Sequence, residues 1–392
     1  MNILQQIFND HFNTVANSGI SIRDTVFENV NKMIHCGDSK YGFALYGCEH
    51  CGQLKFVPFR CKSRFCASCG NLYSFKRSTS MSFKLIRSPH RHCVFTIPEQ
   101  LRIFFRKDRT LLNCIFRAVA DCILFMFKKM NKSENLTPGF ICVLHTFGRS
   151  LQWNPHIHVL LSEGGTGNKS IWRKVTHFEF NFLRKSFCML LLNYMEKHIG
   201  RSFKKVKSFI YKHCLNGFYV YAKPTLTNNK DVIKYIGRYL GRPVIASSRI
   251  DNYDGQNVTF HYNRHEDDQL VIETVSATEF IKKLIVHIPD KHFKMIRYYG
   301  IYAKKHKNSD KLFLVVSKQK RRFLTSLNAW RTSLLLSFGY DPLKCKCGHL
   351  MTVLEICHKG TPLIEITESF SLLRKFTRST KQTTTHQLKV FC

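Results

Sequence analysis

The chain has 392 residues, of which 44% are apolar, so it is long enough for two or three domains and too apolar to be disordered throughout. Its 61 lysines and arginines against 26 acidic residues give a formal net charge of +35. Self-repulsion on this scale destabilises a compact monomer unless a polyanion neutralises it, so the charge favours a nucleic-acid partner. The N-terminus lacks the pattern of a secretion signal, and no apolar run approaches the roughly 18 residues of a membrane span.

Cysteines cluster near the N-terminus, where six of the sixteen lie between residues 36 and 69. In a chain without an export signal, such clustering favours metal ligands over disulfides. Two Cys-x-x-Cys pairs with 14 residues between them have the spacing of a zinc ribbon, with the apolar run 54–59 as its hairpin. The expected ligands of a structural zinc ion are Cys48, Cys51, Cys66 and Cys69. Two more, Cys36 and Cys61, are either part of a second site with His35 or His50, or core thiols.

The cysteine-rich region is also basic. Its residues include Arg60, Lys62 and Arg64. These side chains either form an ordinary solvated surface or grip DNA phosphates from a small, rigid, zinc-bound module, and we favour the second interpretation.

The next segments alternate between strand and helix patterns. A strand is expected over 92–98, helices over roughly 100–130, a strand over 139–147 and a helix around 176–199. This arrangement predicts an α+β fold, built on an antiparallel sheet with helices on one face.

Residues 151–165 contain the most informative pattern, in which His156 and His158 flank one apolar residue and an apolar run follows. In a strand, residues i and i+2 point to the same face, so both imidazoles leave one side of the sheet while Ile157 packs on the other. Two imidazoles on a rigid strand can bind one divalent metal ion. Taken alone, the pattern favours a strand with two polar residues facing solvent, and the rest of the chain changes that weighting.

Residues 231–243 are expected to contain a helix, with Asp231 as its N-cap, Gly241 as its stop and Pro243 just beyond. Tyr235 and Tyr239 stand at i and i+4, so both hydroxyls lie on one helix face. The neighbouring basic pair consists of Lys234 and Arg238. By itself this is the pattern of an amphipathic helix with buried rings; beside a metal site and a zinc module, it indicates a nuclease that attacks DNA with tyrosine.

Further strands are expected at 258–263 and 270–275 as an antiparallel extension, and 304–322 is a charge-rich stretch. The predicted domains are a zinc-binding module over 1–89, a catalytic domain over 90–330 and a partly disordered C-terminal segment over 331–392.

Several motifs together resemble one known family. They include CEHCGQLKFVPFRCKSRFCASCG (48–70), LHTFGRSLQWNPHIHVLLSEGG (144–165), KYIGRYLGRPVIASSRI (234–250) and EFIKKLIVHIPDKHFKMIRYYGIY (279–302). The chain resembles the rolling-circle, two-tyrosine transposases of the insertion-sequence-ninety-one group, which are histidine–hydrophobic–histidine (HUH) endonucleases. The resemblance implies a bacterial, cytoplasmic, nucleoid-associated enzyme that cleaves and joins single-stranded DNA at the ends of a mobile element.

The resemblance also assigns residue roles. It implies that His156 and His158 bind a catalytic Mg²⁺ or Mn²⁺, that Tyr235 and Tyr239 are the nucleophiles, and that Cys61 joins the zinc-binding cysteines. Related nucleases take a third metal ligand from a neighbouring strand, and His145 is the candidate here; a structural histidine is the equal alternative.

Three features depart from the family pattern. Asn154 stands where relatives often carry histidine, Cys345-Lys346-Cys347 has Cys-x-Cys in place of Cys-x-x-Cys, and the tail after about residue 365 matches nothing known. The second departure argues against a metal knuckle near the C-terminus. The competing functions are a rolling-circle replication initiator or relaxase, and a non-catalytic zinc-dependent DNA-binding protein.

Overall fold

The computed structural model describes residues 2–130, 133–175, 177–222, 243–264, 266–303, 312–327, 329–339, 341–358 and 361–362. The chain divides into two compact units. We call residues 1–76 with 319–392 the terminal unit, and residues 77–318 the central unit. This division differs from the expected one, because the described residues of the C-terminal segment group with the N-terminal module.

The terminal unit is built on an antiparallel sheet in the order β13-β12-β1-β2. Its strands are β1 (Gly42–Gly47), β2 (Leu54–Pro58), β12 (Thr352–His358) and β13 (Thr361–Pro362). Its helices are α1 (Ile3–Ala16), α2 (Asp24–Ile34), the short η1 (Ser39–Tyr41), α10 (Lys318–Ser326) and α11 (Trp330–Phe338), together with the first part of α3 (Ala67–Ser82). Because β12 pairs along the whole of β1, the C-terminal strand completes a sheet that the N-terminal segment begins.

Helix α1 begins with a capping box, in which Asn2 and Gln5 exchange hydrogen bonds with each other's backbone amides. The Gln5 side chain also donates to the carbonyl oxygens of Met33 (2.9 Å) and Cys36 (3.0 Å) at the end of α2. Buried polar groups require such partners, so this amide fixes the position of the chain where the cysteine-rich region begins.

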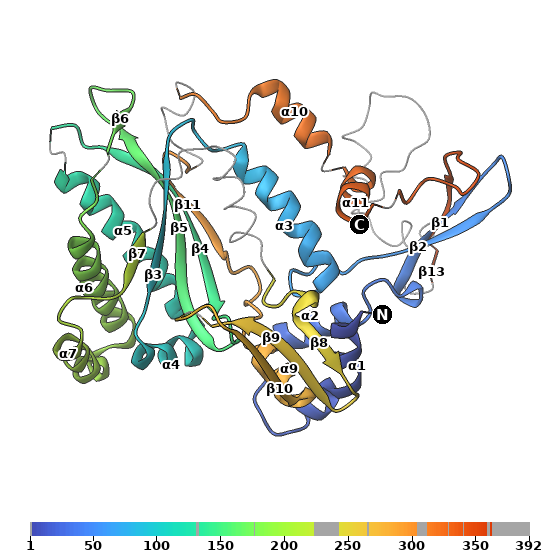
Figure 1. The fold of residues 1–392 in the computed structure, drawn as a ribbon, viewed down its shortest axis with the longest axis horizontal. Coiled ribbons are helices and arrows are strands. Elements are labelled where there is room, and N and C mark those ends of the chain that lie inside the picture. The colour runs from blue at the N-terminus through green and yellow to red at the C-terminus, as the bar shows by residue number, and fades with distance from the viewer. Residues whose placement is uncertain are drawn as a thin grey trace. The chain divides into compact units, whose positions relative to one another are not determined.

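The central unit is organised around an antiparallel sheet in the order β11-β4-β5-β3-β7, with β6 paired to β5. Its strands are β3 (His90–Thr96), β4 (Thr137–Phe147), β5 (Trp153–Thr166), β6 (Arg173–Lys174), β7 (Val220–Ala222) and β11 (Ile296–Gly300). Its helical segments up to β7 are α4 (Glu99–Lys107), η2 (Arg109–Leu111), α5 (Leu112–Met130), α6 (Phe180–Ile199), η3 (Arg201–Phe203) and α7 (Lys204–His213). Helices α5 and α6 lie together on one side of this sheet (Figure 1), as the sequence predicts.

A second antiparallel sheet, in the order β10-β9-β8, follows in the same unit. It consists of β8 (Ile250–Tyr253), which follows η4 (Ser247–Arg249), then β9 (Asn257–Asn263) and β10 (Leu270–Ser276), after which α9 runs over Ala277–Ile285. The strands expected at 258–263 and 270–275 are thus confirmed as β9 and β10.

The main core lies between the first sheet and its helices. Phe95 of β3 and Val159 of β5 are fully buried there with Phe116 and Val119 of α5. The opposite face of the sheet buries a smaller cluster, in which Val143 and Leu160 pack with Met81. Alternate residues of each strand therefore enter different environments, and this alternation decides which face carries the histidines.

Residues Arg109–Met130, which include α5, form the one helix among the described residues that is long and apolar enough to cross a membrane. From the sequence alone, no apolar run of this length was predicted. A core helix of a globular protein passes the same test of length and composition, and 61% of the apolar window is buried inside the structure.

Candidate metal centres

Strand register brings three histidines together on the face of the sheet opposite α5. His145 of β4 pairs directly with His156 of β5, and Val143 pairs with His158. Directly paired residues of antiparallel strands share a face, so His145 joins the two histidines that the strand period already places side by side. Ligand nitrogens of His145, His156 and His158 all lie within 4.8 Å of one another.

Hydrogen bonds define the tautomer of His156. Its Nδ1 lies 2.7 Å from the backbone carbonyl oxygen of Asn154, which can only accept, so Nδ1 carries the proton and Nε2 presents a lone pair. That Nε2 lies 3.1 Å from Nε2 of His158. The contact comes from the Asn154 backbone, so it does not depend on the side chain at this position.

His158 is buried, and its ring is neutral. Burial, followed by the neighbouring His145, His156 and His92, holds the pKa of His158 well below its usual range. A neutral imidazole is the form that binds metal ions.

His92 of β3 also belongs to this site, although the sequence did not lead us to expect it there. Its Nε2 lies 3.0 Å from Nδ1 of His158, and both side chains are almost fully buried. If the His158 proton sits on Nδ1 and is donated to His92, then Nε2 of His158 is free for a metal ion, an arrangement common behind metal-binding histidines. The signal was present in the sequence, since His90 and His92 repeat the His-x-His spacing where the strand expected over 92–98 begins.

The donor set of the three histidines suits a divalent cation. Two cis ligands of an octahedral ion at about 2.1 Å stand about 3 Å apart, close to the observed separation of the two Nε2 atoms. Asn154, on the same face of β5, has a side-chain oxygen that is buried without a hydrogen-bond partner among the described residues. Imidazole nitrogens fit Mn²⁺ better than Mg²⁺, which prefers oxygen ligands.

Tyr235 and Tyr239, together with the basic pair Lys234 and Arg238, lie outside the described residues. Their assigned roles stay predictions. The last element described before them is β7, whose Tyr221 pairs with Val94 of β3. Val94 in turn pairs with His158, so Tyr221 lies on the histidine face of the sheet.

The expected zinc ligands in the terminal unit separate into two groups. Cys66 and Cys69 join Cys36 and Cys61, whereas Cys48 and Cys51 join Cys345 and Cys347. The expectation of one tetrahedron from the two Cys-x-x-Cys pairs is therefore wrong. Cys48 and Cys51 occupy the turn between β1 and β2, and the five residues of β2 carry the chain about 15 Å away before Cys61.

The group formed by Cys36, Cys61, Cys66 and Cys69 has the features of a metal knuckle. The Cys36 and Cys69 sulfurs are 3.5 Å apart, near the roughly 3.8 Å expected for two thiolates on tetrahedral zinc. Backbone amides donate to sulfur, from Cys61 to Cys36 at 3.3 Å and from Ser63 to Cys61 at 3.4 Å. Hydrogen bonds with the other three cysteines of the group, Cys61 first, lower the pKa of Cys36. Hydrogen bonds with the other three, Cys36 first, together with burial, raise the pKa of Cys61. Four cysteine sulfurs this close together could all ionise only with a cation between them, so the group is a candidate site for a structural zinc ion.

The basic residues expected to contact DNA differ in exposure. Arg60 and Lys62 are exposed, and Lys62 has a positive φ of 55°. Arg64 is half-buried, with its guanidinium 6.0 Å from the centre of the Tyr73 ring. A role for these residues in DNA binding stays a prediction.

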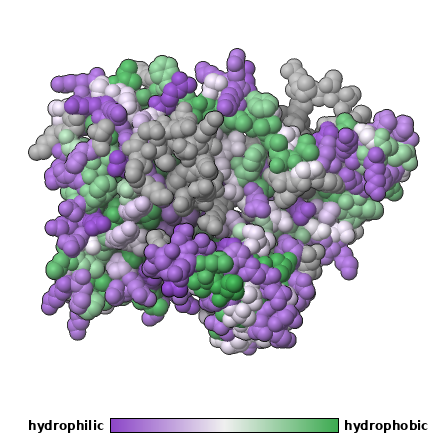
Figure 2. Space-filling view, viewed as in Figure 1, coloured by the Kyte–Doolittle hydropathy of each residue, from purple (hydrophilic) through white to green (hydrophobic). Residues whose placement is uncertain are grey.

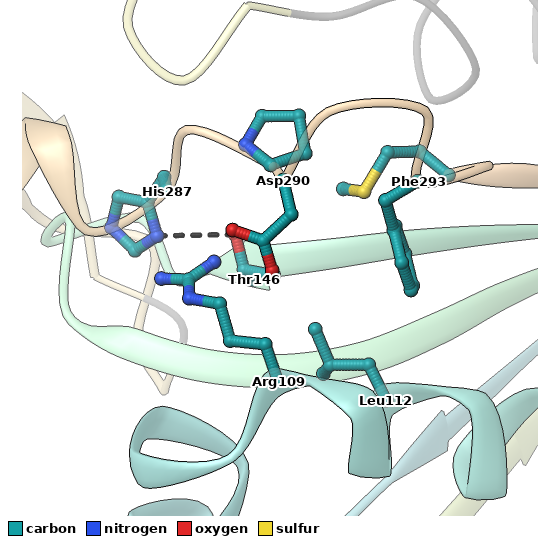
Figure 3. Close-up of a pocket in the computed structure, with 8 residues that line it drawn as sticks. Arg109, Leu112, Thr146, His287, Asp290 and Phe293 are labelled. Carbon is teal, nitrogen blue, oxygen red and sulfur yellow. Dashed lines mark hydrogen bonds between the residues drawn. The ribbon is translucent and has the colours of Figure 1, made fainter. Parts of the chain in front are cut away.

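A small pocket lies on the helix side of β4 and is distinct from the histidine site (Figure 3). Thr146 borders it and donates to Nδ1 of His287 at 3.1 Å, whereas the adjacent His145 points to the other face. Nε2 of His287 donates to the Leu151 carbonyl oxygen at 2.9 Å. Arg109, which also lines the pocket, donates to the Val286 carbonyl oxygen. The two bonds of His287 attach the segment after α9 to β4 and to the turn that follows it, and the bond of Arg109 attaches the same segment to η2.

Two family models match the chain. One, described as a putative transposase, matches residues 139–310, and the other, described as a transposase zinc-binding domain, matches residues 7–97. The chain is 30% identical over 300 residues to the transposase for insertion sequence element IS801 of Pseudomonas savastanoi pv. phaseolicola, covering 72% of this chain and 71% of that protein. It is 28% identical over 294 residues to putative transposase y4qJ of Sinorhizobium fredii, covering 69% and 73%. No solved structure matches.

Proposed function

The chain belongs to the insertion-sequence-ninety-one family of transposases, and from this premise we propose that it cleaves and rejoins single-stranded DNA at the ends of a mobile element through a 5′-phosphotyrosine linkage. The observation that carries the proposal is the convergence of His145, His156 and His158 on one face of the central sheet. We accordingly assign the central unit to the HUH endonucleases.

The three histidines position a divalent cation at the scissile phosphate. When bound, Mn²⁺ or Mg²⁺ supplies charge that polarises a phosphoryl oxygen. The rigid pairing of β4 with β5 holds the imidazoles in place before DNA arrives, so little reorganisation opposes the reaction. His92 acts as a positioning residue, because it contacts the ring of His158 and not the metal position.

Tyr235 and Tyr239 supply the nucleophiles. The phenol of one tyrosine loses its proton to water, its oxygen attacks phosphorus, the bond from phosphorus to the 3′ oxygen breaks, and that oxygen takes up a proton from water. The products are a 5′-phosphotyrosine and a free 3′ hydroxyl. Because the linkage conserves the energy of the phosphodiester bond, the strand can be rejoined without ATP. The second tyrosine allows a second cleavage while the first strand is still attached.

Surface charge and exposed aromatic rings support a single-stranded DNA substrate. Figure 2 shows hydrophilic side chains over much of the visible face, and the chain carries a net charge of +35. In the central unit, Tyr221 of β7, the outermost described strand of its sheet, is 41% exposed, and Tyr219, which directly precedes β7, is 55% exposed. Exposed rings beside lysines and arginines are typical of surfaces that stack unpaired bases.

Replacing both tyrosines tests the proposal directly. With single-stranded oligonucleotides that carry candidate element ends, the wild-type protein should form a covalent protein–DNA band in Mn²⁺. Tyr235→Phe and Tyr239→Phe should each impair strand transfer, and the double variant should form no adduct. Tyr211→Phe, at an exposed tyrosine of α7, is the matched control. An adduct in the double variant would refute the assignment.

Replacing the histidines separates chemistry from binding. His156→Ala with His158→Ala should abolish metal-dependent cleavage yet leave most of the salt-sensitive DNA binding, because phosphate contacts come from the basic surface. His261→Ala, at a histidine paired with Asp251 on the second sheet, is the control. A plasmid-origin oligonucleotide run in parallel distinguishes a transposase from a replication initiator or relaxase.

A further inference from the structure

Two cysteines near the C-terminus lie against two cysteines of the N-terminal hairpin. The Cys48 and Cys347 sulfurs are 3.6 Å apart, and the Cys51 and Cys345 sulfurs are 3.5 Å apart. All four ligand atoms lie within 4.8 Å of one another, and all four thiols are free. Thiolates on a tetrahedral zinc ion with bonds of about 2.3 Å stand about 3.8 Å apart, so these sulfurs are close to the arrangement that zinc requires.

The two cysteine segments form matching turns despite their different spacing. In the first turn the Gly52 amide donates to the Cys48 carbonyl oxygen at 2.8 Å, and in the second the Gly348 amide donates to that of Cys345 at 3.0 Å. Each glycine directly follows the second cysteine, and their φ values are +70° and +91°. This left-handed conformation favours glycine, so the shorter Cys-x-Cys makes the same kind of knuckle with a turn one residue tighter. The spacing argument against a C-terminal knuckle therefore does not hold.

The sheet around these cysteines has little apolar core of its own. Among the described residues, its buried cluster consists of Ala44, Tyr46, Cys48, Cys345 and Met351, with six partly buried apolar side chains packed against it. Two of these five residues are themselves members of the cysteine group. A core this small is seldom sufficient without a metal ion or another cross-link.

We propose that Cys48, Cys51, Cys345 and Cys347 bind a second zinc ion, which fastens the C-terminal strand to the N-terminal hairpin. The ion holds β12 beside β1 at the end of both strands, and its ligands come from segments 294 residues apart. The site cannot form until the chain has been made as far as Cys347. A copy of this transposase that ends earlier retains only the zinc at Cys36, Cys61, Cys66 and Cys69.

The two sites differ in access to solvent. Cys51 and Cys347 are exposed, whereas the other group has Cys36, Cys66 and Cys69 buried. A chelator should therefore remove the second zinc ion first.

A competing group shares one ligand with the proposed site. His50, Cys347 and His349 also lie within reach of one ion, with the two imidazoles stacked 3.9 Å apart. The four-cysteine set is the stronger candidate, because it offers a complete tetrahedron of thiolates. Replacing both histidines with alanine should leave the zinc content unchanged.

The number of zinc ions bound by the full-length protein tests the proposal. All measurements use a background protein that carries His156→Ala and His158→Ala, so that the histidine site of the central unit binds no metal. Elemental analysis should give two zinc ions per chain. Cys345→Ser with Cys347→Ser should give one, and so should Cys61→Ser with Cys66→Ser. Cys114→Ser with Cys214→Ser, at half-buried cysteines of the central unit, should still give two.

Two further measurements guard against variants that misfold. Cys347→His replaces one zinc ligand with another, so it should retain two ions. In the background protein with all its cysteines, release to a chelator should occur in two phases of equal amplitude, and the fast phase should be absent from Cys345→Ser with Cys347→Ser. One zinc ion per chain in the background protein, or two in that double variant, would overturn the proposal.

Discussion

Acidification should weaken the central unit through His287, which is buried and neutral. Burial chiefly, together with the charges of Arg109 and Arg106, lowers the pKa of His287 from 6.5 to about 4, although its hydrogen bond to Leu151 acts in the opposite direction. Between pH 6.5 and about pH 4, His287 is protonated in the unfolded chain but neutral in the folded chain. The stability that the neutral ring contributes is thus fully present above pH 6.5 and is lost as the pH falls towards 4.

The expected loss follows from the size of the shift. A difference of about 2.5 pKa units corresponds to about 3 kcal/mol of unfolding free energy between pH 7 and pH 4. The bonds of His287 to Thr146 and Leu151 hold the turn between the two metal-binding strands, so the same acidification should reduce metal affinity.

Urea denaturation of wild type and His287→Gln at several pH values isolates this residue. Glutamine can donate and accept hydrogen bonds but does not titrate. The variant should be less stable at pH 7, and its disadvantage should shrink by about 3 kcal/mol by pH 4. Other histidines titrate in both proteins and cancel in the difference. A difference in stability that stays constant with pH would refute the reasoning.

Three further predictions concern single side chains. His92→Ala should weaken binding of Mn²⁺ by about 10–100-fold without changing the DNA affinity, measured by calorimetry, because it removes the hydrogen bond that orients His158. Tyr221→Ala should weaken binding of single-stranded DNA by about 1–3 kcal/mol in a fluorescence titration, because the aromatic ring stacks on a base. Tyr221→Phe keeps the ring and should retain the wild-type affinity. Equal losses of affinity in both variants would contradict stacking. Glu163→Gln should cost about 3 kcal/mol of stability, because Arg91 loses its buried partner at 2.8 Å, whereas Asp268→Asn in an exposed pair should cost less than about 1 kcal/mol.

The local features of this protein follow from its amino-acid sequence alone. Strand alternation placed His156 and His158 on one face, and apolar periodicity predicted the helices that became α5 and α6. Cysteine spacing indicated a zinc module at the N-terminus, because a knuckle is a turn formed by a few consecutive residues. Each of these features has a period or spacing that fits within one helix, strand or turn. The order of the amino acids is therefore sufficient to predict it.

Which strands pair, and which side chains come into contact as a result, depends on the tertiary structure. His145 reaches the metal position because β4 pairs with β5 in one register, and a shift of one residue would have turned its side chain to the helix face. His92 contacts His158 through the pairing of β3 with β5, a contact between residues 66 apart in the sequence. The cysteines sort into two groups because β2 separates the knuckles and β12 returns beside β1. Contacts of this kind depend on strand pairing over long separations, which no local spacing encodes.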